Sequence, residues 1–427
     1  MENVSPVIFF LAITIFILTY AIIISEKIHR TVIALAGATL MILLGVMNQE
    51  VAIEGIDFNT LGLLIGMMVI VTIAKDSGMF QYVAIWASKV GKGKPIPIFI
   101  LLGLIVAIFS AFLDNVTTVL LMMPVTFVVA NNLKLNPMPF IIGTILLSNI
   151  GGAATLIGDP PNILIGSASG LDFNDFLFNL APISLVGTAV TILMLYFWYR
   201  KQLVTTPGAS ATIMKFKPSE AITNKSLLVK SLITLGLVLI GFFTHSLLHL
   251  EGATIALGGA ALLLLLTLND PEHHLRDVEW TTIFFFIGLF ILVSGLEHVG
   301  AIRLLAEKAL ELTGGDLKIL TIVIIWGSAV FSAAVDNIPF VATMIPLIQD
   351  IGAISGINLT PLWWALALGA DIGGNATIIG ASANVVVSGM AEKEGYKIGF
   401  MNYMKVAAPM TFVVLLIVTA YMLLRYL

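Results

Sequence analysis

Four acidic residues occur inside long apolar stretches of this sequence, where a charged side chain is unfavourable. Asp114 and Asp336 are each followed by asparagine between apolar runs, and Asp159 and Asp371 belong to glycine-rich stretches. An ionisable residue in such surroundings indicates an ion-binding or proton-carrying site. For the two Asp-Asn pairs the alternative is structural, because aspartate and asparagine also cap helix ends.

Two glycine-rich segments interrupt runs that would otherwise be continuous apolar helices. They read NIGGAATLIGDPPN (149–162) and DIGGNATIIGASAN (371–384). Pro160 and Pro161 cannot continue a helix, so we expect a break into half-helices whose free N–H and C=O groups bind a solute or an ion. The alternative is a packing kink, in which small residues allow close helix approach.

The candidate solute- and ion-binding residues are the polar side chains of these segments and one glycine at a break. They are Asp114, Asn115, Thr117, Thr118, Asn149, Thr155, Gly158, Asp159, Asn162, Asp336, Asn337, Asp371, Asn375, Thr377, Ser382 and Asn384. No Lys or Arg falls inside a predicted span or hairpin tip. This favours a proton, a cation or a neutral solute over a doubly charged anion, although helix N-termini also bind anions without arginine.

An internal repeat relates these segments at one offset of 222 residues. Residues 109–125 overlay 331–347 with 8 identities in 17, and the two glycine-rich segments share 8 of 14. The apolar pair around each Asp-Asn is short for two crossings, so we expect a re-entrant hairpin. Each repeat then crosses the membrane an odd number of times, which inverts the second repeat relative to the first.

We therefore predict an all-α polytopic membrane protein with two inverted-topology repeats, each of about five spans plus a re-entrant hairpin and a broken helix. Repeat 1 covers 1–200, with its hairpin at 97–130 and its broken helix at 138–168. A cytoplasmic linker covers 201–228. Repeat 2 covers 229–427, with its hairpin at 318–350 and its broken helix at 361–390.

The composition supports a membrane protein and excludes a water-soluble enzyme. Of 427 residues, 59% are apolar and 11% are charged, which supplies ten spans of roughly 20 residues. There is no cysteine, so thiolate metal sites and cysteine nucleophiles are excluded. No basic tract indicates nucleic acid as a partner. The six histidines lie at span ends or in one loop, where we expect interfacial side chains rather than metal ligands.

The distribution of basic residues predicts an orientation. With the linker in the cytoplasm, 17 Lys and Arg lie inside and 4 lie outside, as the positive-inside rule requires. Both termini are then extracytoplasmic, and the protein is a multi-pass protein of the cytoplasmic membrane.

FLDNVTTVLLMMPV and NIGGAATLIGDPPN resemble the ArsB/NhaD ion transporter superfamily, which has a citrate-transporter-like domain. The resemblance is strongest to the branch of arsenite-efflux permeases and the pink-eyed dilution P protein. It implies scaffold and transport domains, a homodimer, an elevator-like movement, and a binding site between hairpin tips and broken helices. The tips read Asp-Asn where the sodium/dicarboxylate branch has Ser-Asn-Thr, which argues against dicarboxylate transport.

The function we expect is proton-coupled efflux of arsenite or antimonite as the neutral hydroxide. Sodium/proton antiport and transport of another small ion, such as an anion or dicarboxylate, are alternatives, and a passive anion channel is an alternative of another class. No nucleophile-base set indicates an enzyme. The coupling ion is a proton, with sodium as the alternative, and no cofactor or metal is expected. The expected partners are a small inorganic solute, the lipid bilayer and a second copy of the chain; the sequence gives no evidence for a soluble ATPase subunit.

Overall fold

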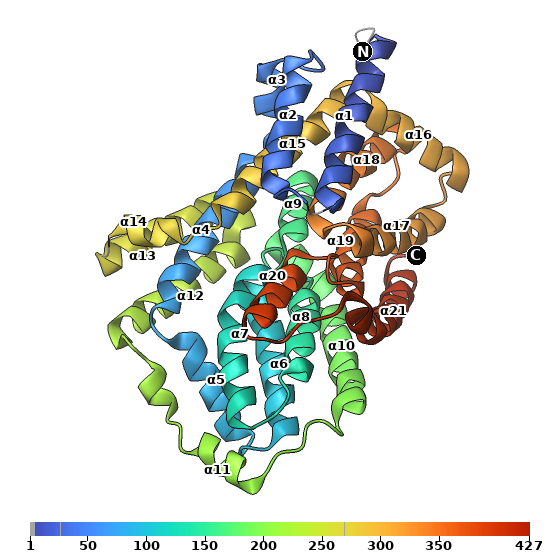
Figure 1. Cartoon of the computed structure of the whole chain (residues 1–427). Coiled ribbons are helices and arrows are strands. Elements are labelled where there is room, and N and C mark those ends of the chain that lie inside the picture. The colour runs from blue at the N-terminus through green and yellow to red at the C-terminus, as the bar shows by residue number, and fades with distance from the viewer. Residues whose placement is uncertain (1–4, 26, 269) are drawn as a thin grey trace.

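The computed structural model describes residues 5–25, 27–268 and 270–427, and this part of the chain is helical without a β-strand (Figure 1). Repeat 1 forms α1 (Pro6–Ser25), α2 (Arg30–Leu43), α3 (Gln49–Glu54), α4 (Phe58–Lys75), α5 (Met79–Val90), α6 (Pro95–Phe112), α7 (Asn115–Asn132), α8 (Met138–Gly152), α9 (Pro160–Ser169) and α10 (Phe173–Tyr199). The linker contains α11 (Pro207–Met214) and the 3₁₀ turn η1 (Pro218–Ala221).

Repeat 2 forms the same succession of helices. They are α12 (Lys225–Leu248), α13 (Gly252–Thr267), α14 (Pro271–Arg276), α15 (Trp280–His298), α16 (Ala301–Thr313), α17 (Leu317–Ala334), α18 (Asn337–Ser355), α19 (Thr360–Gly373), the 3₁₀ turn η2 (Gly374–Ala376), α20 (Ser382–Lys393) and α21 (Phe400–Arg425). The order α1 to α10 thus recurs as α12 to α21.

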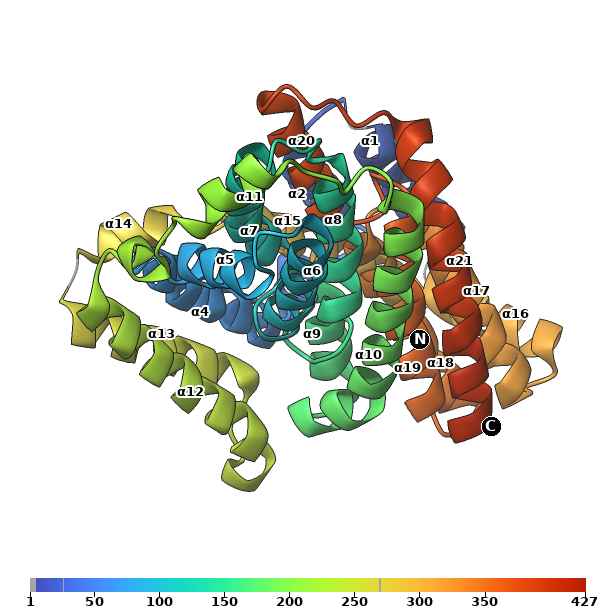
Figure 2. The ribbon, with the colours of Figure 1, turned by 90° about the horizontal axis from the view of Figure 1, so that it is seen from below.

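Ten helices in the described residues are long and apolar enough to cross a membrane. They are α1, α4, α6, α7, α10, α12, α15, α17, α18 and α21. On α12, large apolar side chains such as Leu232, Ile233 and Ile240 are exposed, as expected of a surface that faces lipid. Figure 2 shows α12 and α13 along one flank, away from α10 and α21. The all-helical, multi-pass fold predicted from the sequence is confirmed.

Helices of each repeat pack against helices of the other, so the two repeats do not form separate halves. The helix α2 packs against α15, and the repeat-related pair α13 and α4 packs in the same way. Both crossings need glycine: a Cβ on Gly66 would lie 2.4 Å from the carbonyl carbon of Ala256, and one on Gly288 would lie 2.7 Å from that of Ala34. Each repeat therefore completes the framework of the other.

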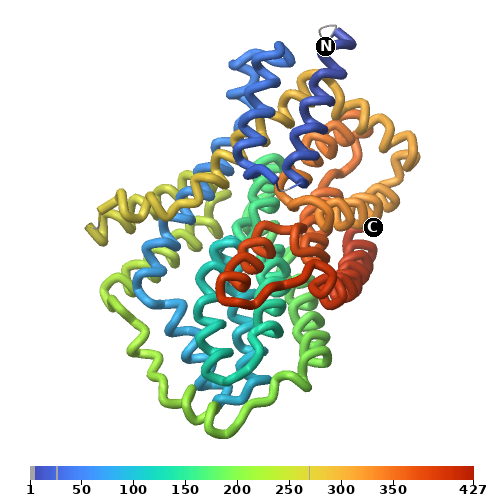
Figure 3. Tube along the Cα trace, in the orientation of Figure 1, coloured from blue at the N-terminus to red at the C-terminus, as the bar shows by residue number. Residues whose placement is uncertain are grey.

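Two tight helical pairs stand at the positions of the predicted hairpins. The helices α6 and α7 are joined by Leu113 and Asp114, and α17 and α18 by Val335 and Asp336. Helix α6 also packs against α8, and α17 against α19; the trace in Figure 3 shows α6, α7 and α8 running side by side. Each pair thus reverses direction at its Asp-Asn sequence, against the helix that enters the glycine-rich break.

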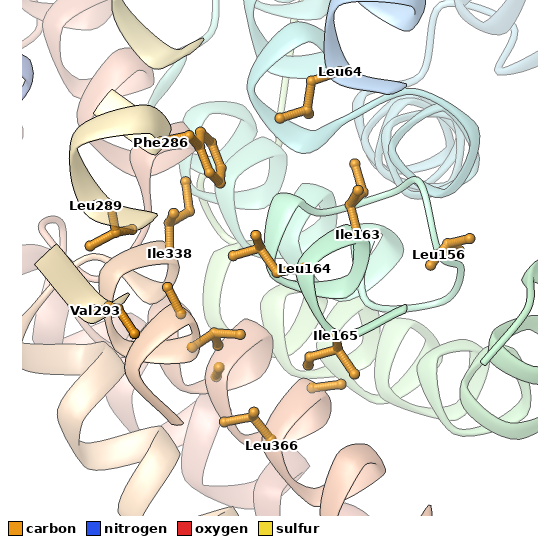
Figure 4. Close-up of a cluster of buried hydrophobic side chains, with 14 of the residues drawn as sticks. Leu64, Leu156, Ile163, Leu164, Ile165, Phe286, Leu289, Val293, Ile338 and Leu366 are labelled. Carbon is orange, nitrogen blue, oxygen red and sulfur yellow. The ribbon is translucent and has the colours of Figure 1, made fainter. Parts of the chain in front are cut away.

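The half-helix α9 is embedded in apolar side chains from both repeats. Ile163, Leu164 and Ile165 of α9 are buried in one cluster with side chains of α4, α15, α18 and α19 (Figure 4). This packing orders the first turn of α9, and hence the break before it.

The linker is attached to repeat 1. Thr223 donates through Oγ1 to the carbonyl of Asp76 at 2.5 Å, and Ser210 donates through Oγ to the carbonyl of Gly93 at 2.8 Å. The helix α12 starts at Lys225, so its first turn takes up the end of the predicted 201–228 segment.

Candidate functional site

Each hairpin-tip aspartate caps the helix that follows it. Asp114 accepts the backbone N–H of Thr117 at 2.8 Å and also the Thr117 hydroxyl. Asp336 accepts the backbone N–H of Ile338 at 3.1 Å. Capping therefore accounts for much of what Asp114 contacts. Asp336 has a second carboxylate oxygen that binds elsewhere.

Hydroxyl groups fasten each hairpin to the broken helix of its own repeat. Ser110 Oγ donates to the carbonyl of Ser148 at 2.6 Å, and Ser332 Oγ donates to the carbonyl of Ala370 at 2.7 Å. Two of the predicted binding residues also join a break to its hairpin: Thr155 donates to the carbonyl of Ala111, and Thr377 donates to that of Ala333. These hydroxyls hold backbone carbonyls.

Asn162 and Asn384 occupy the same place in the two breaks. The Nδ2 of Asn162 donates to the carbonyls of Thr155 at 3.0 Å and Gly152 at 3.4 Å. The Nδ2 of Asn384 donates to the carbonyls of Thr377 and Gly374, both at 2.8 Å. Each side-chain Nδ2 thereby binds carbonyls that a broken helix leaves unpaired. The Oδ1 of the same amide is not used in these bonds.

Gly158 is a residue of close approach. A Cβ on it would lie 2.4 Å from the carbonyl oxygen of Gly152 and 2.7 Å from that of Ser110. No side chain fits between the break and the hairpin here, so Gly158 positions the site by its lack of a side chain.

The four polar segments meet in one buried network that joins the repeats. Asn149 donates to Asn384 Oδ1 at 2.8 Å and to Asn375 Oδ1 at 2.9 Å. Asn115 donates to Asn149 Oδ1 at 3.1 Å and to Asp159 Oδ2 at 2.5 Å. We call the following residues the polar centre: Asn115, Asn149, Asp159, Asn162, Asn337, Asp371, Asn375 and Asn384, of which none is more than 2% exposed.

Asp159 and Asp371 have opposite surroundings within the polar centre. Both oxygens of Asp159 accept an amide N–H, from Asn115 at 2.5 Å and from Asn337 at 3.3 Å. Neither oxygen of Asp371 has a hydrogen-bond partner among the described residues, and the same holds for Asn115 Oδ1 and Asn162 Oδ1. Four buried acceptor atoms without a donor are unfavourable, and a proton or a small cation is what such a group accommodates.

A cavity of about 510 Å³ lies at the tip of α17 and α18, where its lining residue Asp336 directly precedes Asn337 of the polar centre. Arg30 lines it, and its Nη1 lies 2.6 Å from Asp336 Oδ2 and 2.7 Å from Ser382 Oγ. Ser382 also donates to Asp336 at 2.5 Å, and the guanidinium lies 4.8 Å from the centre of the Phe285 ring. An ion pair in contact with a serine and an aromatic ring thus contributes to the lining of the cavity.

Arg30 is the residue that the sequence reasoning missed. It stands at the first position of α2, outside the hairpin tips and glycine-rich segments that were predicted to bind. Its side chain nevertheless reaches Asp336, a hairpin-tip residue 306 positions away in the sequence. A signal was available in the repeat, because the residue at the matching position of repeat 2 is Gly252. An arginine without a counterpart next to a span is a candidate for a role that only one repeat has.

A second cavity of about 440 Å³ is the repeat-related counterpart of the first. Its lining includes Gly252 where the first has Arg30, and Ile163 where the first has Val385. Its charged and titratable lining residues are Asp172, Asp175, His245, His249 and Glu251. His245 Nε2 lies 4.0 Å from Asp172 Oδ2. Both cavities are lined by carboxylates, and the first differs in that it also contains the guanidinium of Arg30, beside Glu279 and Asp336.

A group of metal-ligand type lies elsewhere, where α4 and α14 approach. The ligand atoms of Asp76, His273 and His274 lie within 4.8 Å of one another. Burial lowers the pKa of the His274 imidazole, and the Asp76 carboxylate opposes that shift. Asp76 and His273 are exposed, so this group belongs to the surface and not to the polar centre.

Ten membrane-length helices in the described part of the chain, two interlocked repeats and a buried polar centre are the features expected of a membrane transporter. The chain belongs to the citrate transporter family, whose model matches residues 20–369. It is 42% identical over 424 residues to a 46 kDa membrane protein of Mycobacterium leprae, covering 98% of this chain and 99% of that one.

The human P protein is 34% identical over 475 residues; the match covers 92% of this chain but only 57% of the P protein. The resemblance to a superfamily with a P-protein branch, predicted from two motifs, is confirmed. Among solved structures, the YdaH transporter of Alcanivorax borkumensis aligns with a TM-score of 0.62 at 14% identity, over 98% of this chain and 97% of that one. At that identity the likeness shows the fold alone.

Proposed function

We propose that this protein is a secondary active transporter that exchanges a small solute against a cation bound at the polar centre. The observation that carries this proposal is the set of four buried oxygens without a donor, on Asn115, Asn162 and Asp371. Acceptor groups of this kind favour a positive charge, and each of them belongs to a hairpin tip or a broken helix, the elements that form ion sites in such transporters.

The solute that we propose is arsenite or antimonite as the neutral hydroxide, exported across the cytoplasmic membrane against protons. The polar centre offers oxygens and amides, and the chain has no cysteine. A thiolate is a soft ligand that would hold a trivalent arsenic atom tightly, whereas hydrogen bonds to its hydroxyl groups release it readily.

Arg30 favours a second candidate, a carboxylate anion such as citrate. The guanidinium already binds a carboxylate, that of Asp336, at 2.6 Å in a cavity large enough for a small acid. A substrate carboxylate could replace Asp336 as the partner, since Arg binds carboxylates with matched geometry. The description of the family as citrate transporters agrees with this candidate.

An elevator-like movement suits the arrangement of the hairpins and the breaks. Each hairpin is fastened to its own broken helix by the hydroxyls of Ser110 and Ser332, so the two would move as a unit. The glycine crossings at Gly66 and Gly288 join the remaining helices of the two repeats and would form the scaffold, which we propose is shared in a homodimer.

The test is transport by the purified protein in proteoliposomes with an imposed pH gradient or an imposed sodium gradient. We expect arsenite uptake that depends on the pH gradient and is retained in Arg30→Gln. Uptake of citrate in place of arsenite, abolished by Arg30→Gln, would select the second candidate. Sodium-driven proton release without either solute would select an antiporter, and flux that follows only the solute gradient would select a channel.

A further inference from the structure

Two adjacent histidines of α14 and an aspartate at the end of α4 bring their side chains together. Asp76 Oδ2 lies 3.9 Å from His274 Nδ1, and the ligand atoms of Asp76, His273 and His274 all lie within 4.8 Å of one another. Donor atoms that share a tetrahedral Zn²⁺ ion lie about 3.4 Å apart, since each is about 2.1 Å from the metal. Small side-chain rotations can close this difference, because Asp76 and His273 are exposed.

The segments that carry these side chains are ordered by contacts of their own. The carbonyl of Asp76 accepts the Oγ1 hydroxyl of Thr223 at 2.5 Å, which attaches the linker to the end of α4. Helix α14 packs against α4, and its cap Asp270 accepts the backbone N–H of Glu272 at 3.0 Å. His274 is buried, with 1% of its surface exposed. The group therefore needs little rearrangement to hold a ligand, which favours binding.

The donor atoms and the surrounding charge indicate which kind of ion would bind. Two imidazoles and one carboxylate suit Zn²⁺ and similar divalent transition metals, whereas Mg²⁺ and Ca²⁺ prefer oxygen ligands alone. Asp270 and Asp277 act electrostatically on His274 and add negative charge. The neighbouring cation Lys75 lies 4.0 Å from Asp277. Three protein ligands leave the fourth position of a tetrahedral ion for water.

We propose that Asp76, His273 and His274 together bind one divalent transition-metal ion of the Zn²⁺ type, which joins α14 of repeat 2 to α4 of repeat 1. This ion is a ligand of the framework and not the transported solute. Lys75 and Asp277, one and three residues from the proposed ligands, line a further cavity of about 200 Å³. The ion therefore orders the framework beside that cavity.

The test measures Zn²⁺ binding by the full-length protein in detergent, after removal of any affinity tag and of bound metal with a chelator. We expect isothermal titration calorimetry to show one equivalent of Zn²⁺ per chain. Asp76→Asn and His273→Ala should each weaken binding by more than the roughly 10- to 100-fold that loss of an outer-sphere partner causes. Both side chains are exposed, so these variants should keep the melting temperature of the metal-free wild type.

Two matched controls change the same residue types outside the group. Glu272→Gln neutralises an exposed acid on α14, and His298→Ala removes an exposed histidine at the end of α15. Both controls should bind Zn²⁺ with nearly the wild-type affinity. Zn²⁺ should also raise the melting temperature of the wild type and of both controls, because a ligand that binds the folded state stabilises it. We expect no such rise in Asp76→Asn or His273→Ala.

Three results would overturn the proposal. The first is a wild-type protein that does not bind Zn²⁺, and the second is binding that is unchanged in Asp76→Asn and His273→Ala. The third is an equal loss of affinity in Glu272→Gln, which would show a general attraction of cations to surface acids. None of these measurements involves transport, so a failure of the proposed function would leave their interpretation unchanged.

Discussion

The two repeats agree in the contacts that hold the broken helices and differ where charge is placed. Ser110 and Ser332 bind equivalent carbonyls. In contrast, Asp159 corresponds to Ala381, Asp371 to Asn149, and Arg30 to Gly252. Each repeat thus contributes one acid that has no acidic counterpart in the other repeat, and repeat 1 also contributes an arginine without a counterpart. We propose that the positions where the copies differ set which ion and which solute can bind.

The largest effect is expected at the glycine crossings, where the repeats are equivalent. Gly66→Leu and Gly288→Leu each place a side chain inside a backbone contact, and we expect a loss of more than about 3 kcal/mol of stability. Both variants should give little folded protein by size-exclusion chromatography. Gly236→Ala is the control, because a Cβ there has no neighbour within 4 Å. Normal folding of either leucine variant would mean that the crossings are not constrained as described.

Arg30→Gln tests the charge that only repeat 1 provides. Asp336 then loses its ion-pair partner, and we expect a loss on the order of 2 kcal/mol, less than for a fully buried pair, because the Arg30 side chain is 27% exposed. The melting temperature in detergent should fall accordingly. Asp336→Asn in the same background should recover part of the loss, and a double variant as unstable as Arg30→Gln alone would show that the pair is not the cause.

Moving an acid between repeats tests whether position or mere presence matters. Asp159→Ala should lose gradient-driven transport, because Asn115 and Asn337 lose their acceptor. Adding Ala381→Asp restores a carboxylate at the repeat-related position. We expect the double variant to recover a fraction of the transport rate, on the order of a tenth, in the same proteoliposome assay. Recovery to the full rate would show that the two positions are interchangeable. It would contradict different roles of the two repeats at this site.

The smallest effect is expected at the repeated serines. Ser110→Ala and Ser332→Ala each remove one buried hydrogen bond to a carbonyl, and we expect about 1 kcal/mol from each. Equal shifts in melting temperature would support equivalent structural roles, whereas a large loss of transport in only one variant would show that this serine also acts in the site.

The repeat, the hairpins and the breaks could be predicted because they leave local signals in the sequence. The Asp-Asn pairs mark reversals between apolar runs, and Pro160 and Pro161 forbid a continuous helix. These features recur at a fixed offset, which separates them from chance. The side-chain types of the polar centre could therefore be named before their positions in space were known.

The division of labour among those residues could not be predicted, because it depends on contacts between distant segments. Thr155 and Asn162 have the same side-chain groups whether they bind a solute or a carbonyl, and only the fold places carbonyls beside them. Likewise, the contact of Arg30 with Asp336 joins the two repeats. The crossed packing of α2 on α15 brings them together, and no local pattern encodes it.

The most direct measurement is the internal pH of proteoliposomes, read by a trapped dye, while solute is added outside. We expect arsenite entry to change the internal pH in the direction of proton exchange, in wild-type protein and not in Asp371→Asn. Solute entry into wild-type vesicles without any change of internal pH, under sodium-free conditions, would contradict proton coupling at the polar centre.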